Sequence, residues 1–200
     1  MHRHQIKRNR PTLETAHAFH KEGSFEISSP RHQLSDEERE AEIRKISNGL
    51  SEIVRQQFPR TQNLEYAILK SHLIIEYALV QYIRSFVAIA IQSADIRFSF
   101  SQKLEFAYLL GFGANDPLLL PTIERLNKVR NQVAHTFFLD RRLVDELLQI
   151  NHEDHRAFKP KNDRERIRGL RYICAAVCGR VAGEIEVKYW LLVNPGVELR

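Results

Sequence analysis

Apolar residues recur along the chain from residue 34 onward at the three- and four-residue spacing of amphipathic helices. The pattern predicts six helices, at about 35–58, 63–93, 99–111, 117–137, 140–150 and 164–192. No alternation of apolar and polar residues is strong enough to compete with this helical pattern. The sequence therefore predicts an all-α fold, an up-and-down bundle of five to six helices.

Residues that favour helix ends stand at the expected places. Ser35 followed by Glu38 has the spacing of a capping box, and Pro59 ends the first helix. Gly111 or Gly113 can end the third helix by adopting a left-handed backbone conformation. The second helix is apolar on most sides, which is typical of the central helix of a bundle.

Residues 1–33 differ from the rest of the chain. They show no sustained period and combine basic side chains with five of the nine histidines, two prolines and a glycine. We expect a basic, flexible arm here and a single helical-bundle domain over residues 34–200. The arm has two interpretations, a basic tether for nucleic acid or a solvated tail that can also pack on a partner subunit.

Composition narrows the class of protein. The 200 residues are 43% hydrophobic and 28% charged, which suits one globular domain, and the net charge of +5 only weakly favours a polyanionic partner. The charged start lacks a following apolar segment, so we expect no secretory signal. The most apolar stretch, residues 73–91, contains Glu76, Gln81 and Arg84, which are costly to bury in lipid. We therefore expect a cytoplasmic protein without a membrane segment.

The chain offers little for metal, cofactor or disulfide chemistry. Cys174 and Cys178 lie one helical turn apart and are interpreted as small buried residues. Histidine pairs occur in the arm and in the polar loop at His152 and His155, but no further ligands follow at a fixed spacing. No glycine-rich phosphate loop is present. We expect neither a metal site nor a cofactor.

The segment RNQVAH, residues 130–135, has the residue types that phosphate chemistry needs. His135 can transfer protons near neutral pH, and Arg130 can bind a phosphate oxygen or stabilise the charge of a transition state. Asn131 and His135 are four residues apart on a helix and so share a face, while Arg130 lies about 100° away. RNA supplies its own nucleophile, the 2′-hydroxyl, so a ribonuclease of this kind needs no metal.

This segment resembles the Arg-x4-6-His motif of the HEPN superfamily, whose domains are helical and include many ribonucleases. The resemblance is strongest over residues 63–151 and includes the segments SHLIIEYAL, SQKLEFAYLLGF and LPTIERLNKVRNQVAHTF. The succession of the last two is most similar to the mannitol-operon-repressor branch, whose members are studied as transcriptional regulators.

The resemblance implies roles for particular residues. Arg130 corresponds to the phosphate-binding arginine, His135 to the catalytic histidine and Asn131 to the polar residue that often follows the arginine. Members commonly form homodimers in which two motifs face one cleft, so a homodimer acting on RNA is implied. In a toxin–antitoxin branch a tyrosine follows the histidine by two residues, and Phe137 stands there instead.

Further polar residues are candidates for the same site. His72 and Glu76 lie four apart on the mostly apolar second helix, so either can point into the cleft to orient His135 or to bind substrate. Glu76 is also a candidate partner for Arg130, because buried acids usually need one. The alternative interpretation of this pair is an ion pair at the edge of the core or a solvent-facing acid.

A basic stretch opens the sixth helix. Arg164, Arg168 and Arg171 share one face and are candidates for binding a nucleic-acid backbone, although Asp163 and Glu165 are interleaved. A solvated helix face is the alternative.

Two functions are thus expected. One is a homodimeric, metal-independent endoribonuclease; the other is a non-catalytic regulator or interaction module that binds nucleic acid, an antitoxin or another regulatory protein. In the second case Arg130 and His135 would only stabilise the negative end of their helix.

Overall fold

The structure is a computed structural model, and it describes residues 35–86, 98–136, 138–150 and 159–194. These residues belong to one compact unit. The predicted arm, residues 1–33, lies outside the described residues, as do residues 87–93 of the second predicted helix.

All six predicted helices are present, and the described residues contain no strand, so the prediction of an all-α bundle is confirmed. The helices are α1 (Asp36–Gln57), α2 (Leu64–Phe86), α3 (Phe100–Leu109), α4 (Leu119–His135), α5 (Arg141–Ile150) and α6 (Asp163–Val193).

The helix starts follow the predicted capping signals. Ser35 accepts a hydrogen bond from the backbone of Glu38, whose carboxylate accepts one from the Ser35 backbone, so the capping box of α1 is confirmed. Ser99 and Gln102 form the same reciprocal pair at the start of α3. Asn162 caps α6 by accepting from the Glu165 backbone.

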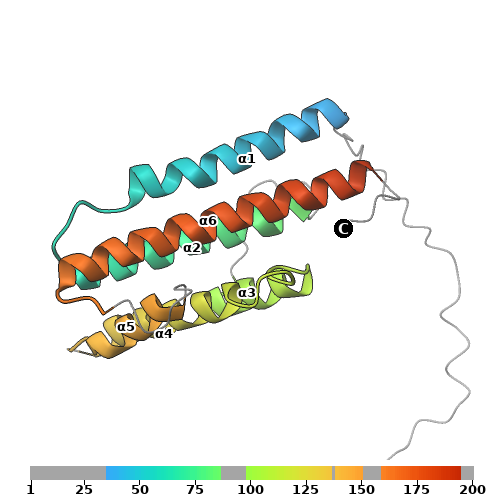
Figure 1. Cartoon of the computed structure of the whole chain (residues 1–200). Helices are drawn as coiled ribbons and strands as arrows, with labels where there is room; N and C mark the ends of the chain where they lie inside the picture. The colour runs from blue at the N-terminus through green and yellow to red at the C-terminus, as the bar shows by residue number, and fades with distance from the viewer. Residues whose placement is uncertain (1–34, 87–97, 137, 151–158, 195–200) are drawn as a thin grey trace, which may run out of the picture. The chain divides into compact units, whose positions relative to one another are not determined.

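Helix α2 lies at the centre of the bundle. It packs against α1, α3, α4 and α6, while α5 packs against α4 and α6. Figure 1 shows α6 running alongside α2, with α1 on one side of this pair and α3, α4 and α5 on the other. The arrangement explains why the second helix of the sequence is apolar on so many sides.

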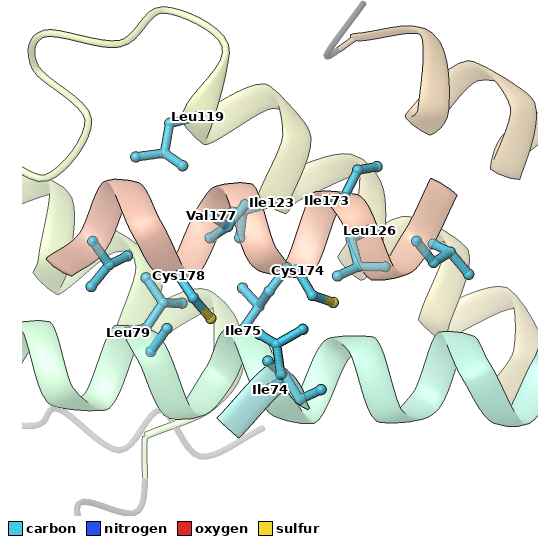
Figure 2. Close-up of a cluster of buried hydrophobic side chains, with 14 of the residues drawn as sticks. Ile74, Ile75, Leu79, Leu119, Ile123, Leu126, Ile173, Cys174, Val177 and Cys178 are labelled. Carbon is cyan, nitrogen blue, oxygen red and sulfur yellow. The ribbon is translucent and has the colours of Figure 1, made fainter. Parts of the chain in front are cut away.

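The core is formed by apolar side chains from every helix, and it fixes the position of α4. Ile123, Leu126 and Val129 are completely buried and recur at helical spacing, so one side of α4 faces inward. Figure 2 shows Ile123 and Leu126 gathered with side chains of α2 and α6, among them Cys174. No helix within the described part of the chain has the length and apolar character needed to cross a membrane.

The connection from α3 to α4 is held by α6. Gly111 and Gly113 have positive φ angles of 86° and 72°, as predicted for the end of α3. The Gly113 amide donates to the Glu184 carboxylate at 3.0 Å, and Lys188 Nζ donates to the Leu110 carbonyl at 2.6 Å. Burial lowers the pKa of the Lys188 amine and raises that of the Glu184 carboxyl.

Candidate active site

The RNQVAH segment forms the last turns of α4. The helix ends at His135, and Thr136 takes up an extended conformation with φ −128° and ψ 152°. The buried residues of α4 stop at Val129, so the segment lies on the outer part of the bundle. The predicted place of the motif, late on the fourth helix, is confirmed.

Arg130 is half-buried and has one hydrogen-bond partner on the segment itself. Its Nη1 donates to Asn131 Oδ1 at 3.1 Å. Asn131 and His135 share a face of the helix, so this bond draws the guanidinium toward the face that carries His135. Within the described residues, no carboxylate forms an ion pair with Arg130, so its charge is available to an external anion.

His135 is exposed at the end of α4. It lies five residues beyond Arg130, which corresponds to about 140° of rotation and about 7.5 Å along the axis. Because of this rotation, the two side chains do not converge from the backbone alone. The hydrogen bond to Asn131 brings the Arg130 guanidinium toward a residue on the same side of the helix as His135.

His72 lies beneath this segment and is buried, with 4% of its surface exposed. Its Nε2 is 3.2 Å from Oδ1 of Asn127, one turn before Arg130, and its ring stacks against Phe100 with centroids 4.2 Å apart. Burial lowers the pKa of His72, and the nearby charge of Arg130 lowers it further. A neutral ring with its proton on Nε2 donates to Asn127, so His72 joins α2 to α4 and is shielded from a substrate.

Glu76 does not pair with Arg130, the partner that the sequence suggested; it pairs with a lysine. Its carboxylate pairs with Lys103 of α3 at 2.6 Å, and His72 Nδ1 is 4.0 Å from its other oxygen. The Lys103 side chain is only 14% exposed, and that of Glu76 is 26% exposed. This is the ion pair at the edge of the core that was the alternative interpretation, with a partner from α3. Lys103 was not predicted as this partner, because the sequence does not show that α3 packs against α2 beside Glu76.

A row of exposed apolar side chains on α2 was also missed by the sequence analysis. Tyr66, Leu69, Leu73 and Tyr77 follow one another at spacings of three and four residues, so they form one stripe, the α2 stripe. Leu73 is 55% exposed. Leu69 lies one turn from His72, and Leu73 one turn from Glu76, so the stripe borders the residues that face α4 and α3.

The three predicted nucleic-acid-binding arginines all lie at the surface of α6. Arg164, Arg168 and Arg171 are exposed, and none forms an ion pair with another described residue. Arg166 differs from them, since it is bound to Asp145 through two hydrogen bonds of 2.7 and 2.9 Å. The structure does not show direct contact between these arginines and the RNQVAH segment.

A surface cleft of about 410 Å³ lies just beyond the end of α4. Its lining includes Phe138, Leu139 and the ion pair between Arg141 and Asp163, whose charges compensate each other. No group of three or more metal-binding side chains comes together in the described ranges. Phe137 and the His152–His155 pair lie outside them.

Comparisons of the chain with protein-family models, with curated proteins and with solved structures found no match. The HEPN resemblance stays a prediction, carried by the motif of residues 130–135 and by the segments around it.

Proposed function

We propose that this chain is a HEPN-like, metal-independent endoribonuclease that acts as a homodimer of up-and-down bundles. The observation that supports this best is the contact between Arg130 and Asn131, because it turns the guanidinium toward the face of α4 that carries an exposed histidine. This guanidinium forms no ion pair with a carboxylate of the described residues. A cation and a proton carrier on one accessible face are what cleavage of an RNA phosphodiester requires.

In the proposed reaction, His135 removes the proton from the ribose 2′-hydroxyl, and the 2′-oxygen attacks the adjacent phosphorus. Arg130 donates hydrogen bonds to the phosphate oxygens as negative charge builds up on them. The bond to the 5′-oxygen breaks, and this oxygen takes up a proton from a protonated His135. The products are a 2′,3′-cyclic phosphate and a 5′-hydroxyl end, and no metal or water takes part in the bond-breaking step.

The angle between the two residues favours a dimer. His135 lies five residues beyond Arg130, so their backbones are rotated by about 140° around α4, and a second copy facing the first would place a second Arg130 and a second His135 on the opposite side of the phosphate. The α2 stripe, which lies one turn from residues that contact α3 and α4, gives such a dimer an apolar surface to bury. In this proposal His72 and Asn127 hold α4 in place, and the Glu76–Lys103 pair fixes α3 beside it.

The nuclease proposal is tested by incubating purified protein with RNA in EDTA. The parent is expected to cleave, and Arg130→Ala and His135→Ala are expected to lose about 100-fold or more of the rate. Lys128→Ala is the matched control, because it removes another exposed cation from α4. Equal cleavage by the parent and by both site variants would show that the activity comes from elsewhere.

The dimer is tested by sedimentation and by mixing variants. Leu73→Glu is expected to yield a monomer, whereas Leu109→Glu, which alters a 74% exposed leucine of α3, is expected to leave the dimer intact. Mixing the inactive Arg130→Ala and His135→Ala proteins is expected to restore part of the activity, since a mixed dimer keeps one of each side chain at the shared cleft. A parent that is monomeric and active contradicts the shared cleft.

The exposed α2 stripe also favours a second candidate function, a non-catalytic regulator or interaction module of the mannitol-operon-repressor type. The stripe would then bind a regulatory partner such as an antitoxin, and Arg130 and His135 would stabilise the end of α4. This candidate predicts binding without any RNA turnover in the cleavage assay.

A further inference from the structure

The first half of α6 presents three arginines and a tyrosine on one exposed face. Arg164, Arg168 and Tyr172 follow one another at intervals of four residues, and Arg171 lies one turn from Arg168. All four are exposed, and Tyr172 is 64% exposed. The intervening positions Ile167, Leu170, Ile173 and Cys174 are buried, so the inner side of the helix is fixed in the core.

The acidic residues around this face are bound to other groups. Asp163 accepts hydrogen bonds from Arg141 and Arg166, and the Glu165 carboxylate accepts one from the Lys161 backbone at 2.7 Å. Asp163 and Glu165, the acidic residues interleaved with the arginines in the sequence, therefore already accept hydrogen bonds from other groups. The three arginines keep their charge uncompensated by any carboxylate in the described part of the chain.

The spacing of the arginines suits a single nucleic-acid strand. From Arg164 to Arg171 the helix rises about 10.5 Å. A stacked strand places one phosphate about every 3.4 Å along its axis, so the distance corresponds to about three steps from one phosphate to the next. Guanidinium groups bind phosphate oxygens through two parallel hydrogen bonds, which makes arginine well suited to such contacts.

Tyr172 adds an exposed aromatic ring to the three arginines. The residues that follow on the same side are small, Ala175 and Gly179, and a Cβ built on Gly179 would meet nothing within 4 Å. The Tyr172 side chain is itself mostly exposed, so its ring is accessible to a flat group. Unpaired bases stack on exposed aromatic rings, whereas the bases of a duplex are already stacked on each other.

We propose that Arg164, Arg168, Arg171 and Tyr172, the α6 track, bind single-stranded RNA, with the arginines on successive phosphates and a base stacked on Tyr172. The inference rests on the proposed function in that it names the form of RNA that the nuclease would take as substrate. The binding itself can be measured without cleavage.

The test is fluorescence anisotropy of a labelled 12-nucleotide single-stranded RNA with full-length His135→Ala protein in EDTA, over a series of salt concentrations. Each phosphate contact on a single strand contributes about −0.7 to the slope of log K against log salt, so the triple variant Arg164→Gln, Arg168→Gln, Arg171→Gln is expected to reduce that slope by about 2. Its matched control removes three exposed cations elsewhere that form no ion pair with a described residue, Arg39, Arg84 and Lys128. Equal slopes for the two triple variants would overturn the track.

Tyr172 is tested separately from charge. Tyr172→Ala is expected to weaken binding by about 5- to 150-fold with an unchanged salt slope, and Tyr172→Trp is expected to restore it. The track is contradicted if Tyr172→Ala binds the single strand as tightly as the parent does. It is also contradicted if the parent binds an RNA duplex of the same length more tightly than the single strand.

The two proposals fail in different ways. A protein that binds the single strand through α6 but cleaves no RNA contradicts the nuclease proposal and supports the track. A protein that cleaves RNA with the parental KM in both the triple variant and Tyr172→Ala contradicts the track and supports the nuclease.

Discussion

Acidification is expected to destabilise this protein through His72. The ring is buried, and burial lowers the pKa in the folded state below the ordinary value of 6.5. The unfolded chain therefore takes up a proton at His72 before the folded chain does. The resulting stabilisation of the folded state is fully present well above about pH 6.5 and is lost as the pH falls through that value toward the lowered pKa.

The size of this effect follows from the proton linkage. If the folded ring stays neutral throughout, the difference in proton binding lowers the free energy of unfolding by about 1.4 kcal/mol between about pH 7.5 and about pH 5.5. A pKa that falls inside this interval reduces the loss. The estimate is therefore the upper limit for this one side chain.

The assay is urea unfolding at both pH values for the parent, for His72→Gln and for His135→Gln. Glutamine can still donate to Asn127, but it cannot take up a proton. His72→Gln is expected to lose up to about 1.4 kcal/mol less than the parent on acidification. His135→Gln, which alters an exposed histidine, controls for removal of a histidine as such. If His72→Gln loses as much stability as the parent, His72 is not the buried neutral contact between α2 and α4.

Three further predictions concern the stability of the bundle. In thermal unfolding, Gly111→Ala is expected to lower the free energy of unfolding by about 1–2 kcal/mol, because the positive φ at this position disfavours a side chain. Gly183→Ala on α6 is expected to raise it by about 0.5–1 kcal/mol, because the added methyl group meets nothing within 4 Å. Arg166→Gln removes the hydrogen bonds that a side chain only 11% exposed donates to the carboxylates of Asp145 and Asp163, and it is expected to lower the free energy of unfolding by about 1–2 kcal/mol. Arg55→Gln, which breaks an exposed pair, is expected to leave the urea midpoint unchanged. Both cysteines are buried, and burial raises the pKa of each thiol to about 12. A thiol reagent is therefore expected to react with them only after the protein unfolds. Rapid labelling of the folded protein would contradict their burial.

The sequence predicted what local rules determine. The helices and their ends depend on residues within one or two turns, and the capping box at Ser35 and the positive φ at Gly111 follow from neighbouring residues. Burial of Cys174 and Cys178 follows from their place on the apolar side of α6. These features need no knowledge of how the helices pack together.

The sequence did not predict which polar side chains on different helices contact each other. Glu76 pairs with Lys103, and His72 contacts Asn127, because α3 and α4 lie where packing against α2 places them. Helical period shows which residues share a face, but it does not show which helix covers that face. For the same reason, the sequence did not reveal that Leu73 is exposed although it lies on the central helix.

Within the candidate site, sequence and structure contributed different parts. The presence of Arg130 and His135 late on α4 follows from the order of residues. The bend of Arg130 toward Asn131 and the absence of a carboxylate partner among the described residues come from the structure. Together they define a testable site at the end of α4.

The central claim is that α4 carries a metal-independent ribonuclease site. Its most direct test is analysis of the RNA ends formed in EDTA by the parent and by His135→Ala, with a 2′-O-methylated RNA as control substrate. The proposal predicts 2′,3′-cyclic phosphate and 5′-hydroxyl ends from the parent alone, and no cleavage of the methylated RNA, because its nucleophile is blocked. Absence of cleavage by the parent, identical ends from His135→Ala, or cleavage of the methylated RNA would contradict it.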